Sequence, residues 1–481
     1  MTTRSGVEYL AGLRDGREVW LAGERVDDVT QHPALRAGAE TIAAWFDLSR
    51  REEEDCLCPG PGPDEQMSVS HLIPRSPGDL ERRHRGLERM ARWHVGMLGR
   101  TPDYVNVSFA GFAGLAQLWA DGGSKGAERL SSFREEVARR DLALTHVLVN
   151  PTIDKSLGEV AGPNGQAALH KVGTTAEGGI VVRGARVLAT LAPFSDEVAV
   201  YPGQPLPGDA SAYALAFSIP VSTPGVKLLC RDSYAVPGSA FDHPFSSRFD
   251  EQDAFVIFDD VEVPAERVFL DGDTEMYNRV MTRGWVANVM QQTTIRAMVR
   301  LQFAYELVTA MSEAIGATDA ATRQALGEIW SYFELTRAAL RAAEADAYDW
   351  GGGVWLCDDR PFRALRPSLP IWFPRVNELI KTLGSHNLLA TPSEADLAEV
   401  ELAEDLARTL RGAGDTGARE RSLLFRTAWD FVGSALGSRA ELYEMFYLAS
   451  SPRSYQLAHL AARQAPGSSL LGQFLAGIEE R

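Results

Sequence analysis

The period of the apolar pattern changes twice along the chain, and this limits the folds that the sequence can adopt. Residues 7–142 carry apolar residues mostly at three- and four-residue spacing, which indicates helices. Between about 147 and 270 the apolar runs become short, β-branched and separated by Gly or Pro, which is typical of strands. From residue 276 onward the helical period returns. The sequence therefore predicts an α+β chain in the order helical, β, helical.

The individual elements follow from the same patterns. Helices are predicted at residues 7–13, 33–47, 80–98 and 126–137, with a Pro- and Gly-rich loop at 56–63. Strands are predicted at 179–182, 185–189, 198–201, 213–220, 226–230 and 254–263, enough for a β-sandwich or barrel. Helices follow at 285–315, 320–350, 370–383, 395–411, 418–436 and 439–448, and the length of the first two favours an antiparallel bundle. We therefore divide the chain into a helical domain (1–145), a β domain (146–272) and a four-helix-bundle domain (273–481).

Composition and charge exclude several classes of function. The 481 residues include 48 basic and 65 acidic ones, and the net charge of −17 would repel a nucleic-acid backbone. No apolar run has the length needed to cross a bilayer, and the N-terminus lacks the apolar core of a signal peptide. The four cysteines form no zinc or redox motif, so no metal is predicted, and their number fits a reducing, cytoplasmic location.

A glycine-rich stretch, GAGDTG at residues 412–417, has the spacing of a dinucleotide-binding loop. Such a loop must follow a strand, whereas the residues before this stretch have a helical pattern. The sequence therefore predicts a connection between two helices here, and no NAD(P)H-binding fold.

Three side chains suggest a site for a phenolate. Arg100 and Tyr104 lie in the stretch GRTPDY at residues 99–104, and His146 lies further along the chain. An arginine, a phenol and an imidazole gathered at one apolar site can stabilise a phenolate. Pro102 makes a turn or a helix start as plausible as a shared helix face. The local spacing equally fits an arginine near a helix end, a half-buried tyrosine and a hydrogen-bonded histidine that share no site.

Further motifs occur in order along nearly the whole chain. They are the opening segment at residues 8–33, GRTPDY at 99–104, FDHP at 241–244, IFDDV at 257–261, QALGE at 324–328, WD at 429–430 and RAELYE at 439–444. Together they resemble the large, oxygenase component of the 4-hydroxyphenylacetate 3-monooxygenase family, which has the acyl-CoA dehydrogenase fold. The likeness is specific for the family but not for the substrate.

The resemblance implies a two-component, FAD-dependent phenol hydroxylase that uses FADH2 and O2 to form a catechol. A separate NAD(P)H-dependent flavin reductase would supply FADH2, in agreement with the missing dinucleotide fold. The substrate would be a small phenol, either free or tethered to a carrier. Family members are dimers or homotetramers, so a homotetramer built as a dimer of dimers is expected.

The resemblance also implies roles for individual residues. In the family, the positions that match Arg100, Tyr104 and His146 surround the phenol oxygen. His146, Asn150, Thr152 and Thr190 would lie along the flavin, and Gly203 and Gln204 would belong to a loop that covers the substrate. Arg100 would supply fixed positive charge, Tyr104 a hydrogen bond, and His146 a base for the phenol proton.

One departure and three alternatives bear on this interpretation. Residues 202–210 contain no Ser or Thr, whereas relatives that bind phenylacetate hold its carboxylate there with small hydroxyl residues. An acyl-CoA dehydrogenase-like flavoenzyme would need a glutamate base, and the sequence singles none out. A related iron–sulfur dehydratase would need three cysteines and a histidine, which the Cys56-x-Cys58 spacing does not provide. An inactive scaffold of the same fold remains open.

Overall fold

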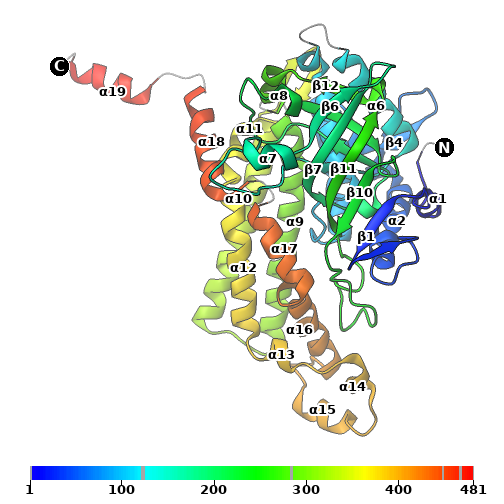
Figure 1. Ribbon diagram of the computed structural model, residues 1–481. Coiled ribbons are helices and arrows are strands. Elements are labelled where there is room, and N and C mark those ends of the chain that lie inside the picture. The colour runs from blue at the N-terminus through cyan, green and yellow to red at the C-terminus, as the bar shows by residue number, and fades with distance from the viewer. Residues whose placement is uncertain (1–2, 121–124, 282–284, 447–448, 465–468, 480–481) are drawn as a thin grey trace.

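A computed structural model describes residues 3–120, 125–281, 285–446, 449–464 and 469–479. Figure 1 shows a β part, with N-terminal helices against it, beside a long bundle of helices that ends in α18 and α19. The predicted α+β class and the order helical, β, helical are confirmed.

The N-terminal part is mainly helical. Its helices are α1 (Gly6–Gly12), α2 (Arg36–Arg51), α3 (Glu53–Cys56), α4 (Pro77–Trp93), α5 (Pro102–Gly114) and α6 (Gly126–Arg140). It also contains strands that the apolar pattern did not predict: β1 (Glu18–Leu21), β2 (Glu24–Val26), β3 (Leu57–Pro59) and β4 (Gln66–Ser68). β3 and β4 form a hairpin, so the loop predicted at 56–63 is wrong at its start. These strands are too short to show a period, and their pairing partners define them.

Two sheets form the β part. The first has the order β2-β1-β10-β11-β7-β6, and the second has the order β12-β9-β8-β5. Their remaining strands are β5 (Leu144–Val147), β6 (His170–Thr174), β7 (Ile180–Thr190), β8 (Glu197–Val200), β9 (Leu215–Pro220), β10 (Val226–Cys230), β11 (Asp253–Val263) and β12 (Val268–Asp271). The short helix α7 (Gly162–Ala167) precedes β6. β1 pairs in parallel with β10, so the N-terminal segment completes the first sheet.

The C-terminal part begins with α8 (Thr274–Val280) and is dominated by α9 (Trp285–Ala314) and α10 (Ala320–Ala345). Next come β13 (Tyr348–Gly351), β14 (Val354–Leu356), α11 (Asp359–Leu365), α12 (Leu369–Gly384) and α13 (Asn387–Ala390). The chain ends with α14 (Glu394–Ala398), α15 (Ala403–Thr409), α16 (Ala418–Val432), α17 (Ala435–Phe446), α18 (Ser451–Gln464) and α19 (Leu470–Glu479). Side chains of α9, α10, α12, α16 and α17 share one buried core.

Two helix predictions in this part need correction. α10 ends at Ala345 rather than at 350, because the β13–β14 hairpin follows it with glycines 351–353 at positive φ. The single helix predicted at 395–411 is two short helices, α14 and α15, none of whose residues is buried. Without an apolar face packed on the core, a continuous helix gains little stability. The stretch at 412–417 connects α15 to α16, as predicted.

α5 lies where the three parts meet. Every residue from Pro102 to Phe112 is buried, so the helix has no solvated face. It contacts α9 of the bundle and β5 of the second sheet. A helix that is buried all round shows no amphipathic pattern, which explains why its periodicity did not predict it.

Candidate functional site

The beginning of α5 fixes the relative positions of Arg100 and Tyr104. Thr101 is the N-cap and Pro102 occupies the first turn, where its missing N–H costs no hydrogen bond. Arg100 therefore stands just outside the helix and Tyr104 just inside it. The guanidinium carbon of Arg100 lies 3.9 Å from the centroid of the Tyr104 ring. The two residues meet through a cation–π contact at a helix start, and not along a helix face.

His146 reaches the same place from β5, which pairs in parallel with β8. Its ring centroid lies 5.3 Å from that of Tyr104 and 5.4 Å from that of Tyr201. Tyr104 is 2% exposed and His146 7% exposed. The structure thus brings Arg100, Tyr104 and His146 together, which the local spacing left open.

The environment of His146 determines its protonation state. Burial, and then the nearby charge of Arg100, hold the pKa of its imidazole well below the ordinary value. The ring is therefore neutral at neutral pH. Its buried Nδ1 atom has no hydrogen-bond partner among the described residues. A neutral ring with an unused nitrogen can accept a proton or a hydrogen bond from a ligand.

Two of the residues assigned to the flavin are buried close to this cluster. The hydroxyl of Thr145, next to His146, donates to the backbone carbonyl of Thr190 at 2.6 Å. Thr190 in turn donates to Asp253 at 2.7 Å. Asn150 donates to Glu159 at 3.1 Å, and its buried Oδ1 has no partner in the described part of the chain.

The other three predicted positions differ in burial. Thr152 and Gln204 are exposed, and no described contact joins them to the Arg100–Tyr104–His146 cluster. The N–H of Gly203 donates to the Tyr277 hydroxyl at 3.1 Å. A Cβ atom at Gly203 would lie 2.5 Å from the backbone oxygen of Leu148, so only glycine fits there.

The sequence interpretation missed the ionic groups behind the cluster. The carboxylates of Glu251 and Asp253 are buried and bind Arg439 of α17. Glu251 also accepts the backbone N–H of Arg100. The available signal was the acidic run at residues 250–253 directly before an apolar strand, since acids in such a place need a buried cation.

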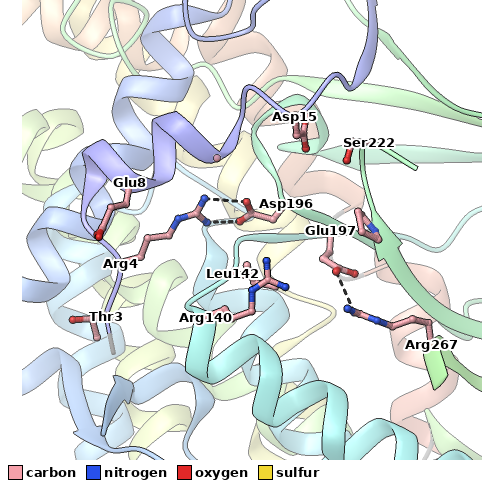
Figure 2. Close-up of a pocket in the computed structure, with 12 residues that line it drawn as sticks. Thr3, Arg4, Glu8, Asp15, Arg140, Leu142, Asp196, Glu197, Ser222 and Arg267 are labelled. Atoms are coloured by element: carbon pink, nitrogen blue, oxygen red, sulfur yellow. Dashed lines mark hydrogen bonds and ion pairs between the residues drawn. The ribbon is translucent and has the colours of Figure 1, made fainter. Parts of the chain in front are cut away.

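A cavity of about 530 Å3 lies apart from these residues, and Figure 2 shows how its charges pair. Arg4 binds Asp196 at 2.6 Å, and Arg267 binds Glu197 at 3.1 Å. Arg140 binds Glu136 at 2.8 Å. Each of these three arginines of the cavity lining is thus paired with a carboxylate.

Two absences concern the part of the chain that the structure describes. No group of three or more His, Cys, Asp or Glu side chains there could hold a metal ion. No helix in that part of the chain has the combination of length and hydropathy that crossing a membrane requires.

Comparisons with known proteins place the chain in a family. Residues 5–270 match the model of the 4-hydroxyphenylacetate 3-hydroxylase N-terminal domain, and residues 277–468 match that of the C-terminal domain. The oxygenase component of 4-hydroxyphenylacetate 3-monooxygenase from Thermus thermophilus is 35% identical, covering 98% of this chain and 97% of the relative. The corresponding protein from a Geobacillus strain is 32% identical, with 100% and 98% covered.

The fold agrees with a solved relative. The crystal structure of the oxygenase component of 4-hydroxyphenylacetate 3-monooxygenase complexed with FAD and 4-hydroxyphenylacetate has a TM-score of 0.92, 33% identity and coverage of 99% and 98%. The resemblance found in the sequence is therefore confirmed along the whole chain. The chain belongs to the 4-hydroxyphenylacetate 3-hydroxylase family.

Proposed function

We propose that the chain is the oxygenase component of a two-component flavin monooxygenase that hydroxylates a phenol next to its hydroxyl group, forming a catechol. The observation that carries this proposal is the neutral, buried His146 ring packed on Tyr104, with the Arg100 guanidinium on the same tyrosine. An acyl-CoA dehydrogenase-like flavoenzyme and an inactive scaffold gain no comparable support.

The three side chains divide the work at the phenol oxygen. His146 accepts the phenol proton at its unused buried nitrogen, and the phenolate that forms beside it offsets the burial and the Arg100 charge that disfavour the imidazolium. Arg100 stabilises the resulting phenolate, since its charge cannot be lost at neutral pH. Tyr104 donates a hydrogen bond to the same oxygen. The phenolate carries more negative charge on its ortho carbon than the phenol does, and this makes the carbon a better nucleophile.

The residues around the cluster fit a bound flavin. The isoalloxazine ring presents both N–H and carbonyl groups, and Asn150 Oδ1 and Gln252 Nε2 are buried polar atoms without a described partner. His146, Asn150, Thr152 and Thr190 would hold FAD. The reduced cofactor, when bound, activates O2 as an electrophile. Gly203 and Gln204 would belong to the segment that covers the substrate and excludes water. All of these flavin and substrate positions lie within the β domain proposed at residues 146–272.

The function can be tested with the purified protein alone, supplied anaerobically with FADH2 and then mixed with O2 and a panel of phenols. We expect one phenol to be converted to its catechol in proportion to the FADH2 consumed. The panel should include 4-hydroxyphenylacetate, a phenol without a carboxylate, and a carrier-tethered phenol, because the loop at 202–210 lacks hydroxyl residues. Flavin reduction by an acyl-CoA would favour the dehydrogenase, and failure to bind FAD in either redox state would favour the scaffold.

We also propose that the chain assembles with further copies of itself. Figure 1 shows α19 extending away from the rest of the protein. Its residues Leu470, Leu471, Phe474, Leu475 and Ile478 are all exposed and lie on one helical face. Exposure of such an apolar face to water is unfavourable. A homotetramer built as a dimer of dimers would bury it.

Replacing Leu471, Phe474 and Leu475 by serine is expected to convert the assembly to smaller species, because burial of these side chains would drive association. Light scattering or sedimentation measures the mass. Val400→Ser is the control, since Val400 is 85% exposed but lies outside α19. An unchanged mass for the triple variant would show that α19 does not hold the assembly together.

A further inference from the structure

A buried ionic network joins the helical bundle to the candidate site. Nη1 of Arg439, on α17, donates to Glu251 Oε2 at 2.8 Å. Its Nε and Nη2 donate to the two oxygens of Asp253 at 2.9 and 2.5 Å. Glu251 is 1% and Asp253 3% exposed. Burial opposes the charge of Arg439, but the two carboxylates outweigh it and raise the pKa of the guanidinium. One cation thus bridges two buried anions.

Each carboxylate also makes a contact that leads to the site. Glu251 Oε1 accepts the backbone N–H of Arg100, whose side chain covers Tyr104. Asp253 Oδ1 accepts the hydroxyl of Thr190 at 2.7 Å. Glu251 therefore links Arg439 to Arg100, which is assigned to the phenol oxygen. Asp253 links Arg439 to Thr190, which is assigned to the flavin.

Tyr443 lies one turn after Arg439 on α17 and strengthens the same connection. The guanidinium carbon of Arg439 lies 4.2 Å from the centroid of the Tyr443 ring, and that of Arg100 lies 5.6 Å from it. A Cβ atom at Gly99 would lie 2.5 Å from Tyr443 Cε1, so the ring packs directly against the chain before Arg100. The Tyr443 hydroxyl lies 3.4 Å from Thr190 Oγ1.

We propose that Arg439 is a positioning residue that sets the Arg100 backbone relative to Thr190, and thereby the phenol oxygen relative to the flavin. This inference rests on the function proposed above and deepens it. The planar guanidinium of Arg439 binds the carboxylate of Asp253 and that of Glu251 at the same time. The single ammonium group of lysine cannot reproduce this arrangement. A lysine at 439 would keep the charge and lose the geometry.

The test measures the ionisation of a bound probe phenol, 4-nitrophenol, whose phenolate absorbs visible light. Oxidised FAD is included, and no turnover is required. Wild-type protein is expected to lower the pKa of the bound probe, and Arg100→Lys to reverse most of this. Arg439→Lys is expected to lower the acid ionisation constant of the bound probe about tenfold, which raises its pKa by about one unit. Glu251→Asp should raise the probe pKa in the same way, because it keeps the negative charge but shortens the link between Arg439 and the Arg100 backbone N–H.

Arg231→Lys is the matched control. Arg231 also binds Asp253, at 2.8 Å, but its guanidinium packs on Tyr234 instead of Tyr443 and makes no described contact with the Glu251 carboxylate. Its substitution should lower the melting temperature and leave the probe pKa at the wild-type value.

The possible results separate the inference from the proposed function. A wild-type probe pKa in both Arg439→Lys and Glu251→Asp, with the Arg100→Lys effect intact, would overturn the positioning role alone. An equal shift in Arg231→Lys would also overturn it, because the effect would then be a general loss of stability. A wild-type protein that binds no probe, or an Arg100→Lys variant with an unchanged probe pKa, would overturn the proposed function as well.

Discussion

Replacing His146 by alanine is expected to lower catechol formation about a hundredfold, the usual cost of removing a positioned acid–base group. The variant should still bind and consume reduced flavin, which then yields hydrogen peroxide instead of product. The reason is that the phenol keeps its proton, and a neutral phenol is a weaker nucleophile than a phenolate. The amounts of catechol and hydrogen peroxide formed per FADH2 consumed measure how the reduced flavin is divided between hydroxylation and peroxide release.

The pH dependence provides a second readout for His146. Burial and the charge of Arg100 hold the pKa of the ring well below its ordinary value. The ring accordingly stays deprotonated as the pH falls from about 8 to about 6, where an ordinary histidine would become charged. The fraction of FADH2 that yields catechol should therefore stay constant over this range.

His170→Ala is the control for the His146 variant. His170 lies on β6, and its Nδ1 atom is 2.8 Å from the backbone oxygen of Ala168. Its ring packs on Tyr213, away from the candidate site. This variant should keep the wild-type partition. A His146→Ala variant that hydroxylates with normal yield would refute the assignment of His146 as the base.

The second large effect is expected for Arg100→Lys, which should lower kcat/KM for the phenol about a hundredfold, comparable to the loss of one group that stabilises an oxyanion. The guanidinium carbon lies over the Tyr104 ring, 3.9 Å from its centroid, and the compact ammonium group of lysine cannot reproduce the shape of the guanidinium. The backbone N–H that binds Glu251 is unchanged by the substitution, so α5 should begin as before.

Steady-state kinetics with varied phenol at saturating FADH2 would measure the Arg100→Lys effect, and circular dichroism would verify the fold. Arg92→Lys is the control, because Arg92 is half-exposed on α4 and its partners Glu88 and Gln302 bind it at the surface. If Arg100→Lys kept wild-type kcat and KM, the phenolate would have to be stabilised by another cation.

The sequence predicted the large elements well and the short ones poorly. The helical period over 285–315 corresponds to α9, and the strands predicted at 226–230 and 254–263 correspond to β10 and β11. Long amphipathic or alternating runs carry their own signal, because each buries one face. β1 and β2 carry almost none, since β1 is stabilised by pairing with β10, about two hundred residues away, and β2 pairs with β1.

The site shows the same division. Arg100, Tyr104 and His146 could be selected as residue types and matched to a family by their motifs. Their contact could not be derived, since it depends on how α5 packs against β5 and on how Tyr201 packs against His146. Arg439 lies in a motif that the sequence identified. Its pairing with Glu251 and Asp253 could not be predicted, because it depends on how α17 packs beside the beginning of β11.

The amino-acid sequence by itself determined the α+β class, the helical, β, helical order, the absence of a dinucleotide loop at 412–417 and the family. Each of these depends on residues close together in the chain or on motifs that recur in order. The tertiary structure decided the neutral state of His146, the stacking of Arg100 on Tyr104 and the network around Arg439. Those properties depend on burial and on distances between side chains far apart in sequence, which only the packing of the three parts fixes.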